Sequence, residues 1–171
     1  PNRTDLVIYY LACFKAGLVA TPLNYRYQAP EIDHALEVTG ASILLAHAER
    51  DADLALSKLA GQLPLGRITY AAEDDRRNFE ELLHTEPTVM DLPSPAADAP
   101  AFIFFTSGST GKPKGVTHTH ETFGWMLASA IAGFEFVPED IFLPASSISH
   151  IGASLFSLAG LAAGIRIDVA H

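Results

Sequence analysis

Segments with a helical spacing of apolar residues alternate with short apolar runs through residues 1–70. The predicted helices and strands span residues 4–16 (helix), 18–22 (strand), 30–39 (helix), 43–46 (strand), 51–60 (helix) and 67–70 (strand). In the second helix, Ile32, Ala35 and Leu36 recur at the helical period and give it one apolar face. This alternation is typical of crossover units, so we expect an α/β fold with largely parallel sheets flanked by helices.

The ends of the first two helices carry residues that favour helix termini. Asn2 or Thr4 can cap the first helix, because a short polar side chain accepts hydrogen bonds from the free backbone N–H groups there. Gly17 follows the last turn, where a left-handed residue commonly ends a helix. Pro30 opens the second helix, where its missing N–H costs nothing, and Gly40 closes it.

Prolines divide the chain into two portions. Four of them fall within residues 87–100, and this density breaks helices and strand ladders alike. We therefore predict a first α/β portion over residues 1–86, a linker or crossing over residues 87–100, and a second α/β portion over residues 101–171.

The second portion opens on Ala101–Phe105, an uninterrupted apolar run that is typical of a central strand covered on both faces. Thr119 can cap the first helix of this portion, with Glu121 in its first turn. The further elements that the pattern predicts span residues 116–118 (strand), 119–132 (helix), 141–144 (strand), 151–163 (helix) and 165–169 (strand).

Composition narrows the class of protein. The chain has 171 residues, of which 49% are hydrophobic and 18% charged, and this balance excludes a disordered chain. The net charge of −9 lacks the basic footprint of nucleic-acid binding, so we expect no nucleic-acid partner. The single cysteine, Cys13, lies in an apolar run and is expected to be a buried thiol, which excludes a disulfide-built scaffold.

Residues 141–165 contain no Lys, Arg, Asp or Glu and are long enough to span a bilayer. They also contain Pro144, His150, three glycines and several serines, and they divide into a strand, a loop, a helix and a strand. We therefore expect buried core here, no transmembrane segment, and a cytoplasmic protein.

The candidate chemistry lies in residues 106–115, which follow the apolar strand directly and read Thr106, Ser107, Gly108, Ser109, Thr110, Gly111, Lys112, Pro113, Lys114 and Gly115. Glycines let backbone N–H groups turn inward around an anion, and hydroxyl groups donate to phosphate oxygens. Two of the four lysines in the chain are here and add positive charge. These residue types also suit a flexible surface loop, but their position after a buried strand favours phosphate binding.

The spacing excludes two common nucleotide-binding motifs. A Walker A loop needs a glycine where Thr106 stands and a Ser or Thr where Pro113 follows Lys112. The G-x-G-x-x-G pattern of dinucleotide-binding folds is absent as well. A P-loop kinase or a Rossmann dehydrogenase is therefore disfavoured.

The stretch FFTSGSTGKPKGVTHTH, residues 104–120, closely resembles the phosphate-loop signature of the adenylate-forming (AMP-binding) enzyme superfamily. Residues 16–41, AGLVATPLNYRYQAPEIDHALEVTGA, resemble the segment that precedes this loop in those enzymes. The closest likeness is to the branch of acyl-CoA synthetases, or fatty-acid–CoA ligases. The chain resembles an interior fragment of the large N-terminal domain of such an enzyme.

This resemblance implies a two-step reaction in which ATP, with Mg²⁺, activates a carboxylic acid, expected to be fatty, and coenzyme A then captures the acyl adenylate. It implies catalytic roles for Lys112 and Lys114, which would neutralise charge on the leaving pyrophosphate. The nucleotide-binding residues would be those of the loop apart from Pro113, with Thr106 nearest the sheet edge. The C-terminal part of the same polypeptide would be a partner, and the fragment would be inactive alone.

A second candidate lies in PASSISHIGAS, residues 144–154, which resembles the region near the carboxylate pocket of the family. His150 is the candidate for lining or gating the acyl site, and a hydrogen-bonded histidine without ligand contact is the alternative. His118 and His120 lack a third ligand at a suitable spacing, so we expect no metal site there. The alternative functions are another adenylate-forming ligase, for an amino or aryl acid, and a non-catalytic nucleotide-binding module.

Overall fold

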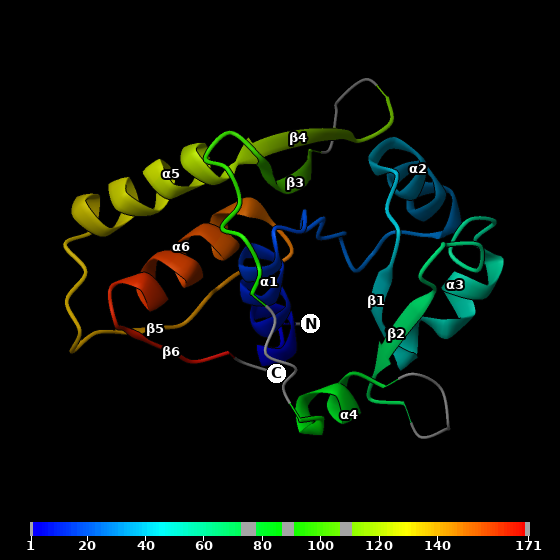
Figure 1. Cartoon of the computed structure of the whole chain (residues 1–171), viewed down its shortest axis with the longest axis horizontal. Helices are drawn as coiled ribbons and strands as arrows, with labels where there is room; N and C mark the ends of the chain where they lie inside the picture. Colours follow the sequence, from blue (N-terminus) through cyan, green and yellow to red (C-terminus); the bar gives the residue numbers. More distant parts are fainter. Residues whose placement is uncertain (1, 73–77, 87–90, 107–110, 170–171) are drawn as a thin grey trace. The chain divides into compact units, whose positions relative to one another are not determined.

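In the computed structural model, the described residues are 2–72, 78–86, 91–106 and 111–169, and they form helices and three two-stranded sheets (Figure 1). The chain divides into two compact units. The first unit comprises Pro1–Tyr25, Leu92–Thr106 and Lys114–His171, and the second comprises Arg26–Asp91 and Ser107–Pro113. The predicted linker at residues 87–100 stays a prediction.

The first unit contains two of the three sheets. Its elements are α1 (Thr4–Ala16), β3 (Pro100–Thr106), β4 (Lys114–Thr119), α5 (His120–Gly133), β5 (Ile141–Phe142), α6 (Ile151–Ala162) and β6 (Arg166–Ile167). Strands β5 and β6 are parallel, as expected, whereas β3 and β4 are antiparallel. The reason is the short connection between β3 and β4, because a parallel crossover needs about a dozen residues or more.

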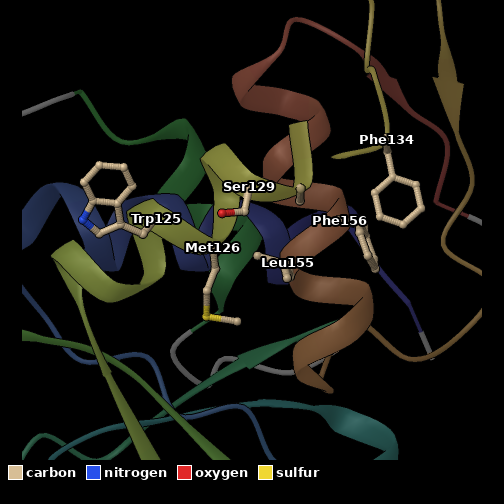
Figure 2. Close-up of a pocket in the computed structure, with 7 residues that line it drawn as sticks. Trp125, Met126, Ser129, Phe134, Leu155 and Phe156 are labelled. Carbon is tan, nitrogen blue, oxygen red and sulfur yellow. The ribbon is translucent and has the colours of Figure 1, made fainter. Parts of the chain in front are cut away.

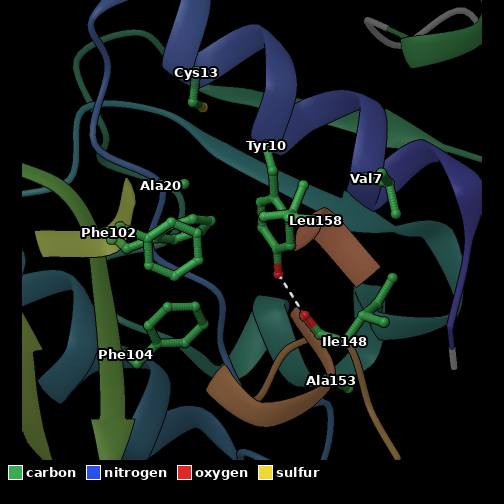
Figure 3. Close-up of a cluster of buried hydrophobic side chains, with 10 residues drawn as sticks. Val7, Tyr10, Cys13, Ala20, Phe102, Phe104, Ile148, Ala153 and Leu158 are labelled. Carbon is green, nitrogen blue, oxygen red and sulfur yellow. Dashed lines mark hydrogen bonds between the residues drawn. The ribbon is translucent and has the colours of Figure 1, made fainter. Parts of the chain in front are cut away.

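An aromatic cluster forms the core of the first unit (Figure 3). Phe102 on β3 is fully buried, and its ring centroid lies 5.0 Å from that of Tyr10 and 4.9 Å from that of Phe14, both on α1. Phe104 and Phe123 each lie 4.7 Å from Phe102. These edge-to-face and stacked rings fix β3 against α1 and α5.

Buried polar groups in this core have partners that join α1 to the segment before α6. The Tyr10 hydroxyl donates to the backbone oxygen of Ile148 at 2.8 Å, as the dashed line in Figure 3 shows, and Ser154 donates to the same oxygen. Cys13 is buried, as predicted, and burial raises the pKa of its thiol, although a hydrogen bond with Tyr9 acts in the opposite direction. Cys13 is therefore held as a neutral thiol.

The second unit is built around one parallel strand pair. Its elements are α2 (Ala29–Thr39), β1 (Leu44–His47), the 3₁₀ helix η1 (Ala48–Arg50), α3 (Asp51–Leu56), β2 (Arg67–Tyr70) and α4 (Phe79–His84). The register pairs Leu44 with Arg67 and His47 with Tyr70. The small core between the helices and this pair consists of Ile32, Leu36, Leu54 and Ala60.

Of the predicted helix ends, the N-cap of α1 needs correction. Arg3, not Asn2 or Thr4, is the N-cap residue of α1. The Asn2 side chain instead bonds Ile148 N at 2.8 Å and Ser146 O at 2.9 Å, so it has left the helix end. Gly17 and Gly40 end α1 and α2 in the left-handed conformation, which confirms both predictions.

Four strands or helices are shorter than predicted, and one was missed. The strand expected at residues 18–22 is a single bridge from Ala20 to Phe102, and those expected at residues 141–144 and 165–169 keep two residues each. Helix α3 stops at Leu56 because the next residues turn back to bond Asp33. Helix α4 was not predicted, since its six residues are too few to show a period.

The uncharged stretch at residues 141–165 divides as predicted into β5, a loop, the twelve-residue α6 and the start of a strand. Ser154, Ser157 and Leu158 are among the buried residues of α6, which confirms that this helix belongs to the core. None of the helices in the described part of the chain is long and apolar enough to cross a membrane.

Asp33 on α2 joins this helix to the segment that follows α3. Its carboxylate accepts hydrogen bonds from the Ser57 hydroxyl, from Lys58 N at 3.1 Å and from Leu59 N at 3.0 Å. Burial acts to raise the pKa of Asp33, but these hydrogen bonds outweigh it and hold the pKa below its ordinary value. The ionised carboxylate therefore stabilises the second unit.

We predict that Asp33→Asn lowers the free energy of unfolding by about 1 kcal/mol at pH 7, because water compensates part of the lost bonds at this half-exposed site. The lowered pKa makes this stabilisation present above pH ~4, the unfolded value, and lost as pH falls through the folded pKa. Denaturant unfolding of both proteins between pH 7 and pH 3 should show the difference shrinking with acid. Glu37→Gln, at an exposed carboxylate of the same helix, is the control, and an acid-insensitive difference would contradict the assignment.

Candidate functional site

The two ends of the candidate phosphate loop lie on neighbouring strands. Thr106 ends β3, Lys114 begins β4, and the antiparallel register pairs these two residues. The Thr106 hydroxyl donates to Lys114 O at 3.4 Å, which links the two ends once more. Ser107, Gly108, Ser109 and Thr110 lie outside the described residues, so their predicted contacts with phosphate stay predictions.

Strand β3 is packed into the core, and this packing fixes the position of Thr106, the residue where the loop begins. Ala101, Phe102 and Phe104 are buried, and Ile103 and Phe105 on the other face are half-buried. This burial agrees with the expectation of a covered central strand. Thr106 is exposed at the end of this apolar run, so the core ends where the polar loop begins.

The loop runs into a strand and not into a helix. The next helix, α5, begins only after β4, where Thr119 caps it by accepting from Thr122 N. The helix that follows the loop in the chain therefore does not begin at the loop, in contrast to a Walker A element.

Both lysines of the loop are exposed. Neither Lys112 nor Lys114 forms an ion pair with a described residue, whereas four arginines in this part of the chain pair with carboxylates. Their charge is therefore available to a ligand. Because the chain carries a net charge of −9, these lysines provide a local attraction for a polyphosphate.

The end of the loop has a contact that the sequence analysis missed. The Nε2 atom of His34 on α2 lies 2.9 Å from the backbone oxygen of Pro113, which stands between the two lysines. The two residues are 79 positions apart, and no spacing rule connects them.

Gly115 in β4 occupies a position where a side chain would not fit. A Cβ atom there would lie 2.9 Å from Ile103 Cγ2 on the paired strand and 3.7 Å from the Phe105 ring. The first separation is too short for two carbon atoms. Gly115 thus allows the hairpin to close next to the loop.

We predict that Gly115→Ala displaces Ile103 and costs about 1–3 kcal/mol of stability through overpacking. Because the change lies beside Lys114, it should also lower the rate of any reaction that uses the loop. Thermal unfolding and turnover measured together check this. Ile103→Ala removes the obstructing methyl group at its own cost in packing, so adding Gly115→Ala to that variant should cost little further stability or turnover. An undiminished cost of Gly115→Ala in the Ile103→Ala background would contradict the steric cause.

His150 is the N-cap residue of α6 and is exposed. Its side chain makes no capping hydrogen bond, and within the described residues it makes no hydrogen bond or ion pair to the loop. The structure therefore places His150 at a helix start in the first unit without joining it to the candidate loop. Its role beside the acyl group stays a prediction.

The two histidines near the start of α5 pack against aromatic rings. The His118 ring lies 6.0 Å from Phe104, and the His120 ring lies 5.9 Å from Phe14. Among the residues that the structure describes, no group of three His, Cys, Asp or Glu side chains could hold a metal ion.

An open apolar groove of about 370 Å³ lies between α5 and α6 (Figure 2). Its lining consists of Trp125, Met126, Ser129, Ala130, Phe134, Leu155 and Phe156. Trp125 is 69% exposed, and Ser129 is the single polar residue of this lining. The groove is shallow and largely open to solvent.

The structure thus joins an α/β fold to a β3–β4 hairpin whose connecting sequence is rich in glycine and hydroxyl residues, with two lysines that form no ion pair with a described residue. The family model of the AMP-binding enzyme matches residues 1–171. The chain therefore belongs to the AMP-binding enzyme family, as the motif predicted.

Individual relatives agree with this family. The chain is 35% identical over 156 residues to a feruloyl-CoA synthase of Amycolatopsis sp, covering 90% of this chain and 28% of that protein. It is 30% identical over 131 residues to the long-chain-fatty-acid–CoA ligase FadD13 of Mycobacterium tuberculosis, covering 71% and 24% respectively. The chain thus spans about a quarter of the length of these relatives.

The fold also matches a solved structure. ATP-bound MatB from Rhodopseudomonas palustris aligns with a TM-score of 0.84 and 22% identity, over 99% of this chain and 33% of that chain. This likeness confirms the predicted α/β fold.

Proposed function

We propose that this chain is part of an acyl-CoA synthetase, which activates a carboxylic acid with ATP and transfers the acyl group to coenzyme A. The observation that carries the proposal is the loop between β3 and β4, with Lys112 and Lys114 exposed at its end and forming no ion pair with a described residue. Membership of the AMP-binding enzyme family supports it. Because the chain spans only part of its relatives, we expect activity from the longer polypeptide and none from residues 1–171 alone.

In the first step, a carboxylate oxygen of the acid attacks the α-phosphorus of ATP and forms the acyl adenylate. The bond from this phosphorus to the bridging oxygen breaks, and pyrophosphate leaves with the electron pair. In the second step, the thiol of coenzyme A loses its proton to solvent and its sulfur attacks the acyl carbonyl carbon. The bond from this carbon to the phosphate oxygen breaks, and AMP leaves with the electron pair as the thioester forms. Mg²⁺ is expected to arrive with ATP as its counter-ion.

The loop residues act on the leaving pyrophosphate. Lys112 and Lys114 neutralise the charge that develops as the bond breaks, and the hydroxyls and backbone N–H groups of residues 106–111 orient the phosphate oxygens. A reaction of this kind depends mainly on positioning and electrostatics. This division of work needs no protein group that gives up or takes a proton in the first step.

The proposed carboxylic acid substrate is an apolar, fatty acid. The groove between α5 and α6 offers an aliphatic and aromatic lining with one polar residue, and α6 begins directly after His150. An aryl acid is the second candidate, favoured by the relative named for a feruloyl group, and His150 would then lie against the acyl portion in either case. A cytoplasmic location stays a prediction.

The loop assignment is tested by Lys114→Ala combined with Thr110→Ala in the full-length gene product. Loss of one positive charge and one hydroxyl from the pyrophosphate should lower ATP–pyrophosphate exchange by about two orders of magnitude. Lys15→Ala, at an exposed lysine in the last turn of α1, is the control and should leave exchange unchanged. Normal exchange in the double variant would exclude the loop as the phosphate site.

The groove assignment is tested by Ser129→Phe, which fills the groove from an exposed position of α5. We predict that kcat/KM for long-chain fatty acids falls at least about tenfold while that for a two- to four-carbon acid stays unchanged. Ala128→Phe places the same ring on an exposed position of α5 outside the lining and serves as the matched control. An equal loss for all acids would contradict binding of the acyl chain in this groove.

A further inference from the structure

His34 makes a polar contact with the end of the candidate loop. Its Nε2 atom lies 2.9 Å from the backbone oxygen of Pro113, and both residues belong to the second unit. A carbonyl oxygen can only accept a hydrogen bond, so Nε2 must carry the hydrogen and donate it. The accepting carbonyl of Pro113 thus shows that Nε2 is a ring nitrogen of His34 that carries a hydrogen.

The helix that carries His34 is held firmly on either side of it. Ile32, Ala35 and Leu36 are buried, and Asp33 accepts three hydrogen bonds from the segment after α3. The ring therefore projects from a fixed backbone. A donor on such a support can determine the orientation of a carbonyl group that it contacts.

The accepting carbonyl belongs to Pro113, which lies between the two lysines of the loop. Proline restricts its own φ angle and biases Lys112 before it toward extended conformations. The peptide that follows is planar, so fixing the Pro113 oxygen also fixes the direction of the Lys114 N–H. The proline ring thus constrains the backbone at Lys112, and the hydrogen bond to Pro113 O constrains the backbone at Lys114.

We infer that His34 is a positioning residue for the phosphate loop. By donating from Nε2 to the Pro113 oxygen, it holds the peptide between the two lysines so that their charges meet the pyrophosphate part of ATP. This role rests on the proposed function of the loop and adds a residue from a distant helix to it. The role requires no contact of His34 with ATP or with the acid.

The test compares His34→Leu, which removes the donor, with His34→Gln, whose amide nitrogen can donate from a similar position. In the full-length gene product, His34→Leu should lower kcat/KM for ATP in the exchange assay about tenfold and leave KM for the carboxylic acid unchanged. His34→Gln should recover most of this loss. His84→Leu, at an exposed histidine of α4, controls for the loss of a histidine elsewhere in the same unit.

A second readout does not depend on activity. Hydrogen–deuterium exchange of the amides in residues 111–115 should be faster in His34→Leu than in the wild type and close to wild type in His34→Gln. Exchange in β1 and β2 should be the same in all variants, which shows that the second unit stays folded.

The outcomes separate this inference from the proposed function. Unchanged kcat/KM for ATP and unchanged amide exchange in His34→Leu would overturn the positioning role, as would an equal loss in the Leu and Gln variants. A wild-type protein without ATP–pyrophosphate exchange would refute the proposed function, and amide exchange would then still decide whether His34 holds the loop end.

Discussion

The position of the candidate site depends on the burial of Phe102. Four aromatic rings surround it at centroid distances of 4.7–5.0 Å, and they come from α1, from α5 and from β3 itself. This contact holds strand β3 in the core of the first unit, and the strand in turn determines where Thr106 lies. Losing a ring of this size from a packed core costs about 3–5 kcal/mol. The packing around Phe102 therefore holds β3, and with it Thr106, in place.

Much of this arrangement follows from local sequence. The helix ends at Gly17 and Gly40, the cap at Thr119 and the strand at residues 67–70 were predicted, because glycine, threonine and β-branched residues have local conformational reasons to stand there. The loop was recognised from residue types that act within a few positions of one another. Its placement at the close of a hairpin agrees with the position predicted directly after a buried strand.

The features that were missed depend on residues far apart in the chain. Asn2 leaves the end of α1 for Ile148, 146 positions away, so its capping ability is overridden by tertiary contacts. Helix α3 ends early because the residues after it bond Asp33 on α2. The antiparallel direction of β4 is a different case, because it follows from the short connection after β3 and not from a distant contact. His34 and Pro113 form the clearest example, since only the fold brings a helix ring to a loop carbonyl.

The two ends of the loop are held by interactions of different strength. The Thr106 end cannot move without disturbing Phe102 and Phe104, which are buried in the core. Among the described residues, Lys114 is paired with Thr106 in the hairpin, and Pro113 accepts a hydrogen bond from His34 whose net contribution is about 1 kcal/mol. Displacing Thr106 therefore costs core packing, whereas separating Pro113 from His34 costs a hydrogen bond of modest energy.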